Sequence, residues 1–454
     1  MNKKITSLRF VFLIKVSCLM VVLSSFSGER EAKREVVKQT NVNAHTSEVV
    51  VEWYSLIKTL TKKTKGYSPP VAARAFGYTG VALYEALVEG MPNRRSMSGM
   101  LSGLEIKTTL EEDKIYYWPA VANGVLAEMT KYFYKNTASR RYKAILALES
   151  KFEEQYILAT SEEIYRDSYL LAKRTAEKII QWSGNDGGRD GSLHNYPPEY
   201  TSPIGDEYWT PTPPEYHAAL QPYWGTNRPF VTSNVEETQP KDPIPFSKKF
   251  NSQFYKAAEE VYYAVKNITP EQKDIAEFWA DDPTTTATPP GHSISILNQV
   301  IKKDDCKLDL AVEAFAKVGI GISDAFISCW KTKYRTVYPR PITYINTYID
   351  EEWEAVLATP PFPEYTSGHS VQSGVLAEIL TNLFGKEYYF VDRTHEGRRD
   401  INGFPRTYIN FYEMAEEAAI SRLYGGIHYR EAIEFGLEQG YKIGKNVNSL
   451  DLIK

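Results

Sequence analysis

The sequence predicts an all-α protein. Apolar residues recur at helical spacing in segment after segment, beginning with residues 49–64. Hydrophobic residues form 43% and aromatic residues 13% of the 454-residue chain, with 32 tyrosines, so a large buried interior is expected. Strand and turn signals occur together between Lys386 and Arg406, where a Tyr-Tyr-Phe-Val run precedes the Asn402-Gly403 pair. We therefore expect packed helices with one small β-hairpin.

The N-terminus has the pattern of a secretory signal peptide over residues 1–28. Its parts are the basic residues Lys3, Lys4 and Arg9, the apolar run 16–23 and the small-residue segment 25–28. The apolar run is too short to anchor the chain in a bilayer, and the alternative is an irregular N-terminal core helix. The next stretch, residues 29–46, is polar and aperiodic, which predicts a disordered leader. We expect an exported protein, periplasmic or secreted, with no stable membrane anchor after cleavage.

The helices are expected in two groups on either side of a long aperiodic segment. The first group comprises residues 49–64, 68–87, 112–134, 139–158 and 161–183, and the second 249–266, 271–280, 293–303, 307–333, 367–384, 408–423 and 429–446. Several boundaries carry start or stop signals, namely Ser68 before two prolines, Ser161 before two glutamates, and Gly385 after an apolar stripe. The two groups predict an N-terminal bundle over residues 47–248 and a C-terminal catalytic bundle over residues 249–454.

The segment 185–246 between the two groups is rich in aromatic residues and Pro-Pro pairs and has no sustained period. A connection of about 60 residues is much longer than usual, so we expect its Tyr and Trp side chains to fix it over a functional site. Asp186 and Asp190 within it allow a calcium interpretation, but their spacing favours a mobile turn.

Charge and cysteine content narrow the class of protein further. A net charge of -4 without a broad basic patch argues against a nucleic-acid partner. Once Cys18 is removed with the signal peptide, Cys306 and Cys329 remain near opposite ends of the helix expected over residues 307–333. A separation of roughly 35 Å along a helix exceeds the reach of a disulfide, so two buried free thiols are expected.

Three basic motifs in the C-terminal half predict a site for a tetrahedral oxyanion. They are Lys333 to Arg340-Pro341, Ser367-Gly368-His369, and Ser421-Arg422 with His428 six residues after the arginine. Arg presents a planar fork to pairs of oxygens, Lys adds a point charge, and N–H groups at the start of a helix complete an anion site. A solvated basic loop is the alternative for Lys333 and Arg340, and a helix-capping histidine without catalysis is the alternative for His369. The presence of all three motifs favours one common site.

These motifs resemble the signature K-x6-R-P, P-S-G-H and S-R-x5-H of the superfamily of type 2 phosphatidic acid phosphatases and vanadium-dependent haloperoxidases. The one departure is Thr366, where the family has Pro. The resemblance implies two helical bundles of the vanadium haloperoxidase type, with the site inside the second, and vanadate as the cofactor. The residues that it implies as contacts of the vanadate oxygens are Lys333, Arg340, Ser367, Gly368 and Arg422.

The resemblance also implies the roles of two histidines. His369 resembles the general acid/base of the family, and we expect the helix N-terminus and nearby cations to lower its pKa. His428 corresponds to the histidine that binds vanadium in haloperoxidases and attacks phosphorus in phosphatases. The family usually has Asp four residues later, where this chain has Ala432, so Glu431 and Glu434 are the candidates to orient the ring.

Other polar residues receive weaker interpretations. His292, in Pro-Pro-Gly-His, is interpreted as structural, whereas Asp281 or Asp282 either pairs with a site arginine or caps a helix at the surface. No role is assigned to the remaining histidines His45, His194, His217 and His395.

Trp330 and Phe362 favour a haloperoxidase over a phosphatase. In vanadium haloperoxidases the matching positions line the halide side of the pocket, and chloroperoxidases resemble this chain in having Trp and Phe there. An apolar wall suits a weakly hydrated halide, although both residues are also typical of a core.

The resemblance to bacterial haloperoxidases, some of them iodoperoxidases, implies that hydrogen peroxide oxidises a halide, iodide first, to hypohalous acid. Small organic molecules are the implied acceptors. In that reaction His369 assists deprotonation of the peroxide and Lys333 polarises it. Two other functions remain open. One is an exported acid phosphatase with His428 as nucleophile and His369 as general acid, and the other is a non-catalytic oxyanion-binding protein.

Overall fold

The computed structural model describes residues 40–454, so the expected signal peptide and residues 29–39 of the expected leader lie outside the described residues. The fold is all-α, as predicted, with one two-stranded sheet. The helices of the first half are α2 (Glu48–Lys63), α3 (Pro69–Leu87), α4 (Trp118–Phe133), α5 (Ser139–Ala159), α6 (Glu162–Ser183) and α7 (Ser233–Glu236). Those of the second half are α8 (Gln253–Lys266), α9 (Pro270–Phe278), α10 (Thr288–Lys303), α11 (Leu308–Thr336), α12 (Pro341–Tyr348), α13 (Gly368–Phe384), α14 (Phe411–Tyr424) and α15 (Arg430–Asn448).

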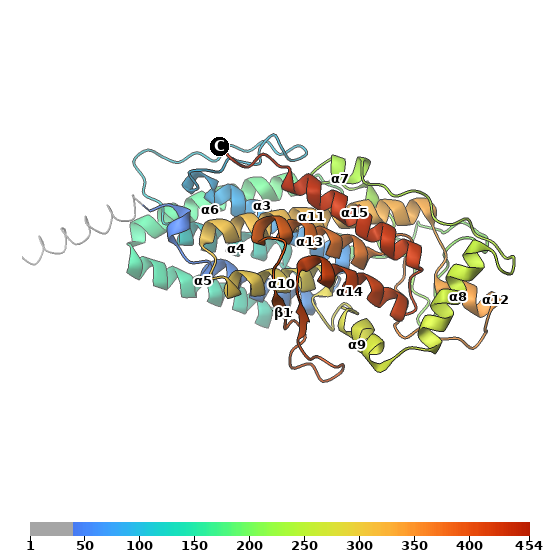
Figure 1. Ribbon diagram of the computed structural model, residues 1–454. Helices are drawn as coiled ribbons and strands as arrows, with labels where there is room; N and C mark the ends of the chain where they lie inside the picture. The colour runs from blue at the N-terminus through green and yellow to red at the C-terminus, as the bar shows by residue number, and fades with distance from the viewer. Residues whose placement is uncertain (1–39) are drawn as a thin grey trace, which may run out of the picture.

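The centre of the molecule is the contact between α3 and α11 (Figure 1). Every residue of α3 from Pro70 to Leu87 is buried, as expected for a helix that is apolar on all sides. Small residues let the two backbones approach closely, because a Cβ at Gly80 would lie 2.6 Å from the Phe315 carbonyl oxygen. A Cβ at Gly319 would likewise lie 2.8 Å from the Phe76 carbonyl oxygen. Larger side chains at these positions would push the helices apart.

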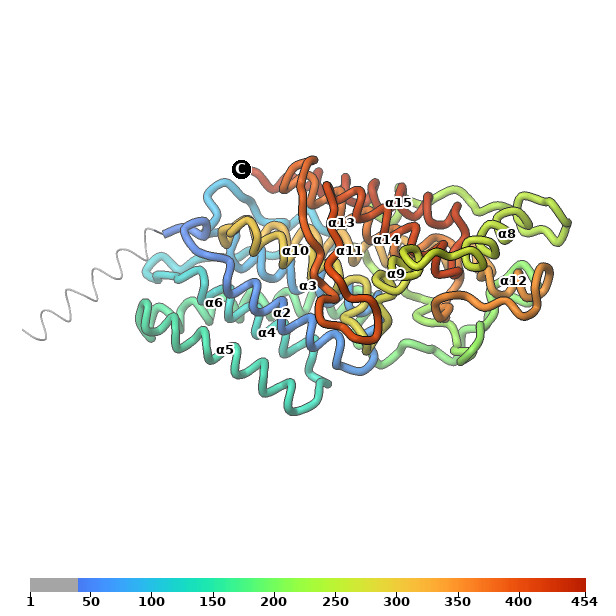
Figure 2. The backbone as a smooth tube through the Cα atoms, turned by 60° about the horizontal axis from the view of Figure 1, so that its bottom comes forward, coloured from blue at the N-terminus to red at the C-terminus, as the bar shows by residue number. Residues whose placement is uncertain are grey.

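The second half is organised around α13, which packs against α11, α14 and α15. The approach to α15 again depends on glycine, because a Cβ at Gly440 would meet the Val371 carbonyl oxygen at 2.2 Å. On the opposite side of the molecule α4, α5 and α6 form an outer layer (Figure 2). At one end α8 and α12 form a smaller apolar cluster with Tyr338 and Tyr429, close to the basic motifs.

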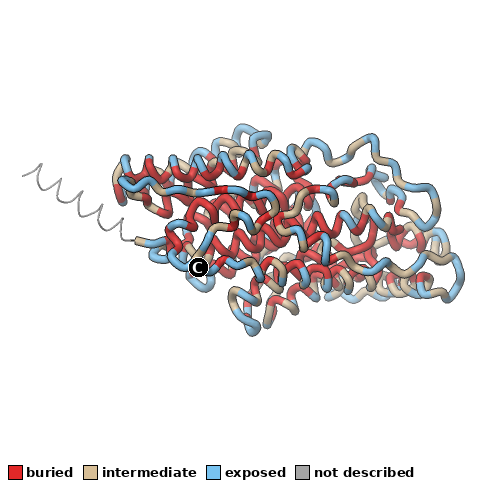
Figure 3. The backbone as a smooth tube through the Cα atoms, turned by 90° about the horizontal axis from the view of Figure 1, so that it is seen from above, coloured by how far each residue is buried: buried red, intermediate tan, exposed pale blue. Residues whose placement is uncertain are grey.

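One continuous hydrophobic core runs through both halves, from Val42 to Leu452 (Figure 3). The division expected at residues 248 and 249 therefore does not separate two cores, because α11 of the second half packs directly on α3 of the first. Val42 itself is fully buried, and the amide of Leu308 donates to the His45 carbonyl at 2.9 Å. The described part of the expected leader, residues 40–46, is thus part of the folded body rather than disordered.

The long segment 185–246 is fixed, as predicted, and charged groups as well as aromatic ones hold it. Its Trp209 is buried and its amide donates to the Val337 carbonyl at 2.7 Å. The buried carboxylate of Asp324 accepts the amide of Phe230 at 2.7 Å. Asp186 is not in a mobile turn as expected: it is 5% exposed and pairs with Arg74 at 2.6 Å.

Several element boundaries differ from the expectation, mostly at prolines. No helix was expected over α12, yet Pro341 occupies its first turn, where a missing N–H costs nothing. Helix α10 begins at Thr288, so His292 lies within its first turns. The predicted hairpin exists as β1 (Phe390–Asp392) paired antiparallel with β2 (Arg406–Tyr408), but Asn402-Gly403 lies inside a long connection and not in a two-residue turn.

Residues 40–454 contain two cysteines that were expected to be buried and free. Cys306 and Cys329 are both buried and free, which confirms that expectation. Among the helices of this range, none has the length and apolar character needed to span a membrane.

Candidate active site

The three basic motifs meet at one end of the helical core. Lys333 lies in the last turn of α11, Arg340 directly precedes α12, and Arg422 lies in the last turn of α14. Ser367 is the N-cap of α13, and His428 lies between α14 and α15. Short connections at helix ends thus bring side chains from distant parts of the sequence together.

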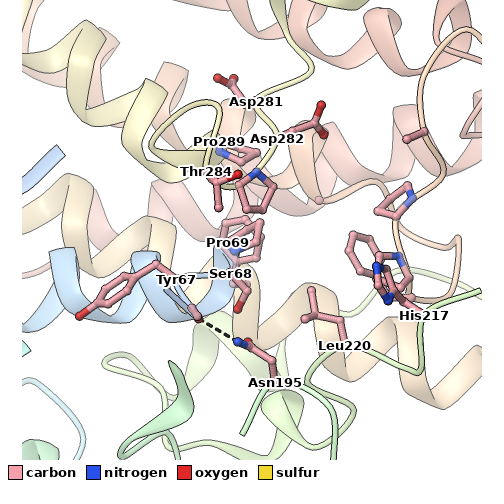
Figure 4. A pocket seen from close by; sticks show the side chains of 18 of the residues that line it. Tyr67, Ser68, Pro69, Asn195, His217, Leu220, Asp281, Asp282, Thr284 and Pro289 are labelled. Atoms are coloured by element: carbon pink, nitrogen blue, oxygen red, sulfur yellow. Dashed lines mark hydrogen bonds between the residues drawn. The ribbon is translucent and has the colours of Figure 1, made fainter. Parts of the chain in front are cut away.

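A cavity of about 1180 Å³ opens onto this cluster. Its lining includes His369, Arg422 and His428, together with the rings of Trp330 and Phe362. Figure 4 shows part of the lining, where Asn195, His217 and Leu220 of the long segment face residues that follow α2 and α9. The long segment therefore forms part of the wall of the site, in agreement with the expectation that it lies over something functional.

Lys333 is completely buried beneath the aromatic wall. Its Nζ donates to the carbonyl oxygens of Pro363 at 2.9 Å and Glu364 at 2.8 Å. The ammonium lies 5.1 Å from the ring centre of Phe362. Burial lowers the pKa of Lys333 to about 7, so its charge is only weakly held without a bound anion.

Arg340 is also completely buried and lies beside His428. Its Nε donates to the Phe362 carbonyl at 3.0 Å, and its Nη1 donates to the Ile427 carbonyl at 2.8 Å. The same Nη1 lies 3.2 Å from Nε2 of His428. Its Nη2 is buried without a hydrogen-bond partner, and burial lowers the pKa of the guanidinium to about 10. Nη2 is thus free to donate to a bound ligand or a water molecule in the site.

The ring of His428 contacts Glu364, a residue that sequence reasoning missed. Its Nδ1 lies 2.7 Å from Oε1 of Glu364. The two candidates from the sequence, Glu431 and Glu434, form no hydrogen bond with the ring. Glu431 instead accepts the amide of Ile244 at 2.9 Å, and Glu434 is exposed. The only sequence signal for Glu364 was a lone carboxylate within the apolar run before Ser367.

The protonation state of His428 follows from these contacts. Burial, with Arg340 and Lys333 next, holds its pKa well below the ordinary value, so the ring is neutral. The carboxylate at Nδ1 assigns the proton to that nitrogen. Nε2 therefore carries a lone pair, and it faces the cations.

His369 begins α13 with its Nε2 buried and without a hydrogen-bond partner. Burial first, and then the charge of Arg422, holds its pKa well below the ordinary value. The expected direction of the shift agrees, although burial contributes more than the cations. Ser367 caps the helix, because its Oγ accepts the amide of Ser370 at 3.3 Å. Gly368 follows it on the cavity surface.

Arg422 is held by the protein backbone and faces acidic residues. Its Nη2 donates to the Ala276 carbonyl at 3.0 Å. Burial lowers its pKa to about 10, and Asp281 and Asp282 act in the opposite direction. Neither role left open for Asp281 is found among the described contacts, because it is buried and pairs with His292 instead of a site arginine, and Asp282 forms no ion pair with Arg422 there either.

Asp281 belongs to a second buried polar cluster. His292 lies between two carboxylates, with Nδ1 2.7 Å from Asp281 and Nε2 2.7 Å from Asp392. Burial opposes its charge, yet the two aspartates raise its pKa to about 10. His395, to which no role was assigned, is buried with Nε2 3.4 Å from Asp281. Because both nitrogens of His292 are taken by carboxylates, the cluster is a closed ion-paired network.

The site fits an oxyanion. Lys333, Arg340 and Arg422 are three buried cations, and Glu364 is the carboxylate nearest to the first two. Buried charges without counter-charge are costly, so a bound anion would stabilise this arrangement. The free Nη2 of Arg340 and Nε2 of His369 supply donor and acceptor positions toward it.

Comparison with known proteins agrees with this chemistry. Residues 313–451 match the family described as the VCPO second helical-bundle domain. The crystal structure of a bacterial vanadium-dependent iodoperoxidase, described as the first of its kind, is 33% identical, with a TM-score of 0.82 over 90% of this chain and 97% of that one. This chain belongs to the vanadium-dependent haloperoxidase family.

Two further structures have the same fold as this haloperoxidase at lower identity. The holo and apo forms of a bacterial vanadium-dependent chloroperoxidase are 15% and 13% identical, with TM-scores of 0.63 and 0.62. The match to the holo form covers 85% of this chain and 92% of that one, and the match to the apo form covers 84% of this chain and 94% of that one. No curated protein matches the sequence. The cofactor of the family is vanadate, and the cluster of buried cations around His428 has the charge and the free polar atoms to hold it.

Proposed function

We propose that this protein catalyses oxidation of halide by hydrogen peroxide, with iodide as the preferred halide. The reaction consumes peroxide, halide and one proton and yields hypohalous acid and water. Family membership supports the reaction class, and the iodoperoxidase among the similar structures supports the choice of iodide. The observation that carries the proposal is the set of three buried cations around a neutral His428 whose Nε2 is not protonated.

The residues that would hold vanadate are Lys333, Arg340, Arg422 and the α13 N-terminus at Ser367 and Gly368, with His428 as the ligand of the metal. Vanadate held by these residues would supply Lewis-acid activation of hydrogen peroxide, which makes a haem or a redox-active cysteine unnecessary. Our assignment of these roles rests on the fit of charge and free polar atoms.

The other side chains handle protons and exclude water. His369 is neutral, so its partnerless Nε2 can accept a proton from peroxide entering the cavity and return it to the departing oxygen. The charged form of Lys333 places positive charge next to the same region. The rings of Trp330 and Phe362, 4.9 Å apart, form the apolar wall where a weakly hydrated halide binds more readily than a phosphate ester.

The experiment compares two assays on the purified protein. Iodide oxidation is measured with vanadate and peroxide, and hydrolysis of p-nitrophenyl phosphate is measured without vanadate. Iodide turnover that requires vanadate supports the proposal, and turnover of the ester alone would refute it in favour of the phosphatase. The His428→Ala variant should lose peroxidase activity, and retention of more than a few per cent would exclude the histidine as metal ligand.

We also propose that the protein is exported and acts on small organic acceptors outside the cytoplasm. The support is the signal-peptide pattern of residues 1–28. N-terminal sequencing of the mature protein from its native cells should give a start at or shortly after Gly28. A mature chain beginning at Met1 would contradict export by this route.

A further inference from the structure

We propose that Glu364 is the positioning residue of His428: it fixes the proton on Nδ1 and aims Nε2 at the bound oxyanion. The inference rests on the proposed function in that it takes His428 as the ligand. No carboxylate of α15 does this work, because Ala432, one turn after His428, has none and Glu431 and Glu434 point elsewhere.

Glu364 is held rigidly enough to orient another side chain. It is fully buried, and its amide donates to the Tyr338 carbonyl at 3.0 Å. Its Oε1 accepts the amide of Tyr429 at 2.9 Å in addition to Nδ1 of His428 at 2.7 Å. Its carbonyl oxygen accepts Nζ of Lys333 at 2.8 Å. One residue therefore ties the cation of the first motif to the histidine of the third.

The contact determines what Nε2 can do. With Nδ1–H donating to the carboxylate, Nε2 has a lone pair, and its hydrogen-bond neighbour among the described residues is Nη1 of Arg340 at 3.2 Å. That Nη1 already donates to the Ile427 carbonyl at 2.8 Å. A carboxylate at the far nitrogen also makes the imidazole a stronger ligand, as it does in many metal sites.

If Glu364 acted only through its charge, its removal would change anion binding in the direction opposite to that expected for a positioning residue. Its negative charge offsets Arg340 and Lys333, so removing it should strengthen the binding of any anion that these cations attract. Removing a positioning group should instead weaken an anion that bonds to Nε2. The two effects differ in sign, so a pair of anions can separate them.

The experiment measures vanadate and sulfate affinity by calorimetry in the absence of peroxide. Sulfate binds through charge and hydrogen bonds, whereas vanadate also accepts a nitrogen ligand. Glu364→Ala should weaken vanadate binding by about 10-fold to 100-fold, as for other groups that orient a metal ligand, and leave sulfate binding unchanged or stronger. Equal changes for the two anions, or no change for vanadate, would overturn the assignment. The matched control is Glu434→Gln, an exposed glutamate of the same region, which should change neither affinity.

A second variant tests the geometry by restoring the carboxylate from another direction. Ala432 is buried four residues after His428, at the position where the family usually has Asp. Ala432→Asp in that background should recover most of the lost vanadate affinity, whereas failure of a folded double variant to do so would count against positioning. If Glu364→Ala does not fold, Glu364→Gln keeps the shape and removes the charge. It should then show a smaller loss of vanadate affinity in the same direction, and unchanged or stronger vanadate binding would overturn the proposal.

Nitrogen NMR of histidine-labelled protein provides a readout that a merely structural role would not change. The His428 ring should show a protonated Nδ1 and a bare Nε2 in the wild type and a mixture of tautomers in Glu364→Ala. A wild-type ring protonated at Nε2 would refute the proposal. None of these measurements requires turnover. Absence of peroxidase activity in the wild type would therefore refute the proposed function. The role of Glu364 would still be decided by the vanadate and sulfate affinities and by the His428 tautomer.

Discussion

Raising the pH should weaken sulfate binding to the cation cluster, because Lys333 loses its proton. Burial lowers the pKa of Lys333 to about 7, and an anion stabilises the charged form. The affinity that depends on this charge is therefore present below that pKa and lost as pH rises through it. The protonated fraction of a group with this pKa falls from roughly 0.9 at about pH 6 to roughly 0.01 at about pH 9, so loss of the Lys333 charge alone should lower the affinity by up to about 90-fold.

Sulfate is the right probe because its own charge stays constant over this range. Calorimetric titrations at several pH values in a buffer of constant ionic strength give the affinity directly. His369 and His428 do not contribute, because burial holds the pKa of each well below its ordinary value and both stay neutral. Glu364 does contribute, because burial raises its pKa to about 7 and its new negative charge opposes the anion in the same window.

Two variants apportion the effect. Lys333→Arg keeps a permanent cation and should leave only the part of the pH dependence that belongs to Glu364. Lys333→Arg combined with Glu364→Gln should bind sulfate with nearly the same affinity throughout. A wild-type affinity that does not change with pH, or a double variant as pH-dependent as the wild type, would refute the assignment of the titration to these two groups.

Three further predictions concern the wall of the site and its support. Phe362→Leu removes a ring that covers two buried cations and should raise KM for iodide by about threefold to tenfold in steady-state assays, and an unchanged KM would contradict its role in the wall. Asp186→Asn leaves the buried guanidinium of Arg74 unpaired and should lower the free energy of unfolding in urea by about 3–5 kcal/mol. The control Asp190→Asn, at a partly exposed ion pair, should lower it little, and equally small losses in both variants would argue against the buried pair. The two aspartates raise the pKa of His292 from 6.5 to about 10. The charged histidine therefore contributes fully to stability below about pH 6.5, and this contribution is lost as the pH rises to about 10. His292→Asn should therefore remove that alkaline loss from the pH dependence of unfolding, and an unchanged alkaline limb would contradict it.

The parts of the site that could be predicted from sequence are those fixed by short spacings. Ser367, Gly368 and His369 are adjacent, and Arg422 and His428 are separated by one tight connection, so helix ends place them without further information. The same holds for the apolar stripes, whose period predicts most helices to within a few residues.

What could not be predicted depends on contacts between distant segments. Glu364 reaches His428 across 64 residues of sequence, and neither residue carries a local sign of the pair. His292 contacts Asp392, which lies 100 residues later in the sequence. The histidine of the Pro-Pro-Gly-His motif is thereby part of an ion-paired network with Asp281 and Asp392. Helix α12 was missed for a different reason, since it has only 8 residues and begins at Pro341, a residue type that also ends helices.

The cations and the histidine pair alone do not separate a haloperoxidase from a phosphatase, because a neutral imidazole backed by a carboxylate serves as metal ligand or as nucleophile. The difference comes from what surrounds them. Trp330 is held in place by the long segment, since its Nε1 donates to the Leu220 carbonyl at 3.2 Å and the amide of Leu220 donates to the Pro361 carbonyl at 2.8 Å. The segment 185–246 thus fixes both sides of the aromatic wall next to Phe362. This apolar wall borders the cation cluster, where it favours a weakly hydrated halide over a strongly hydrated phosphate ester.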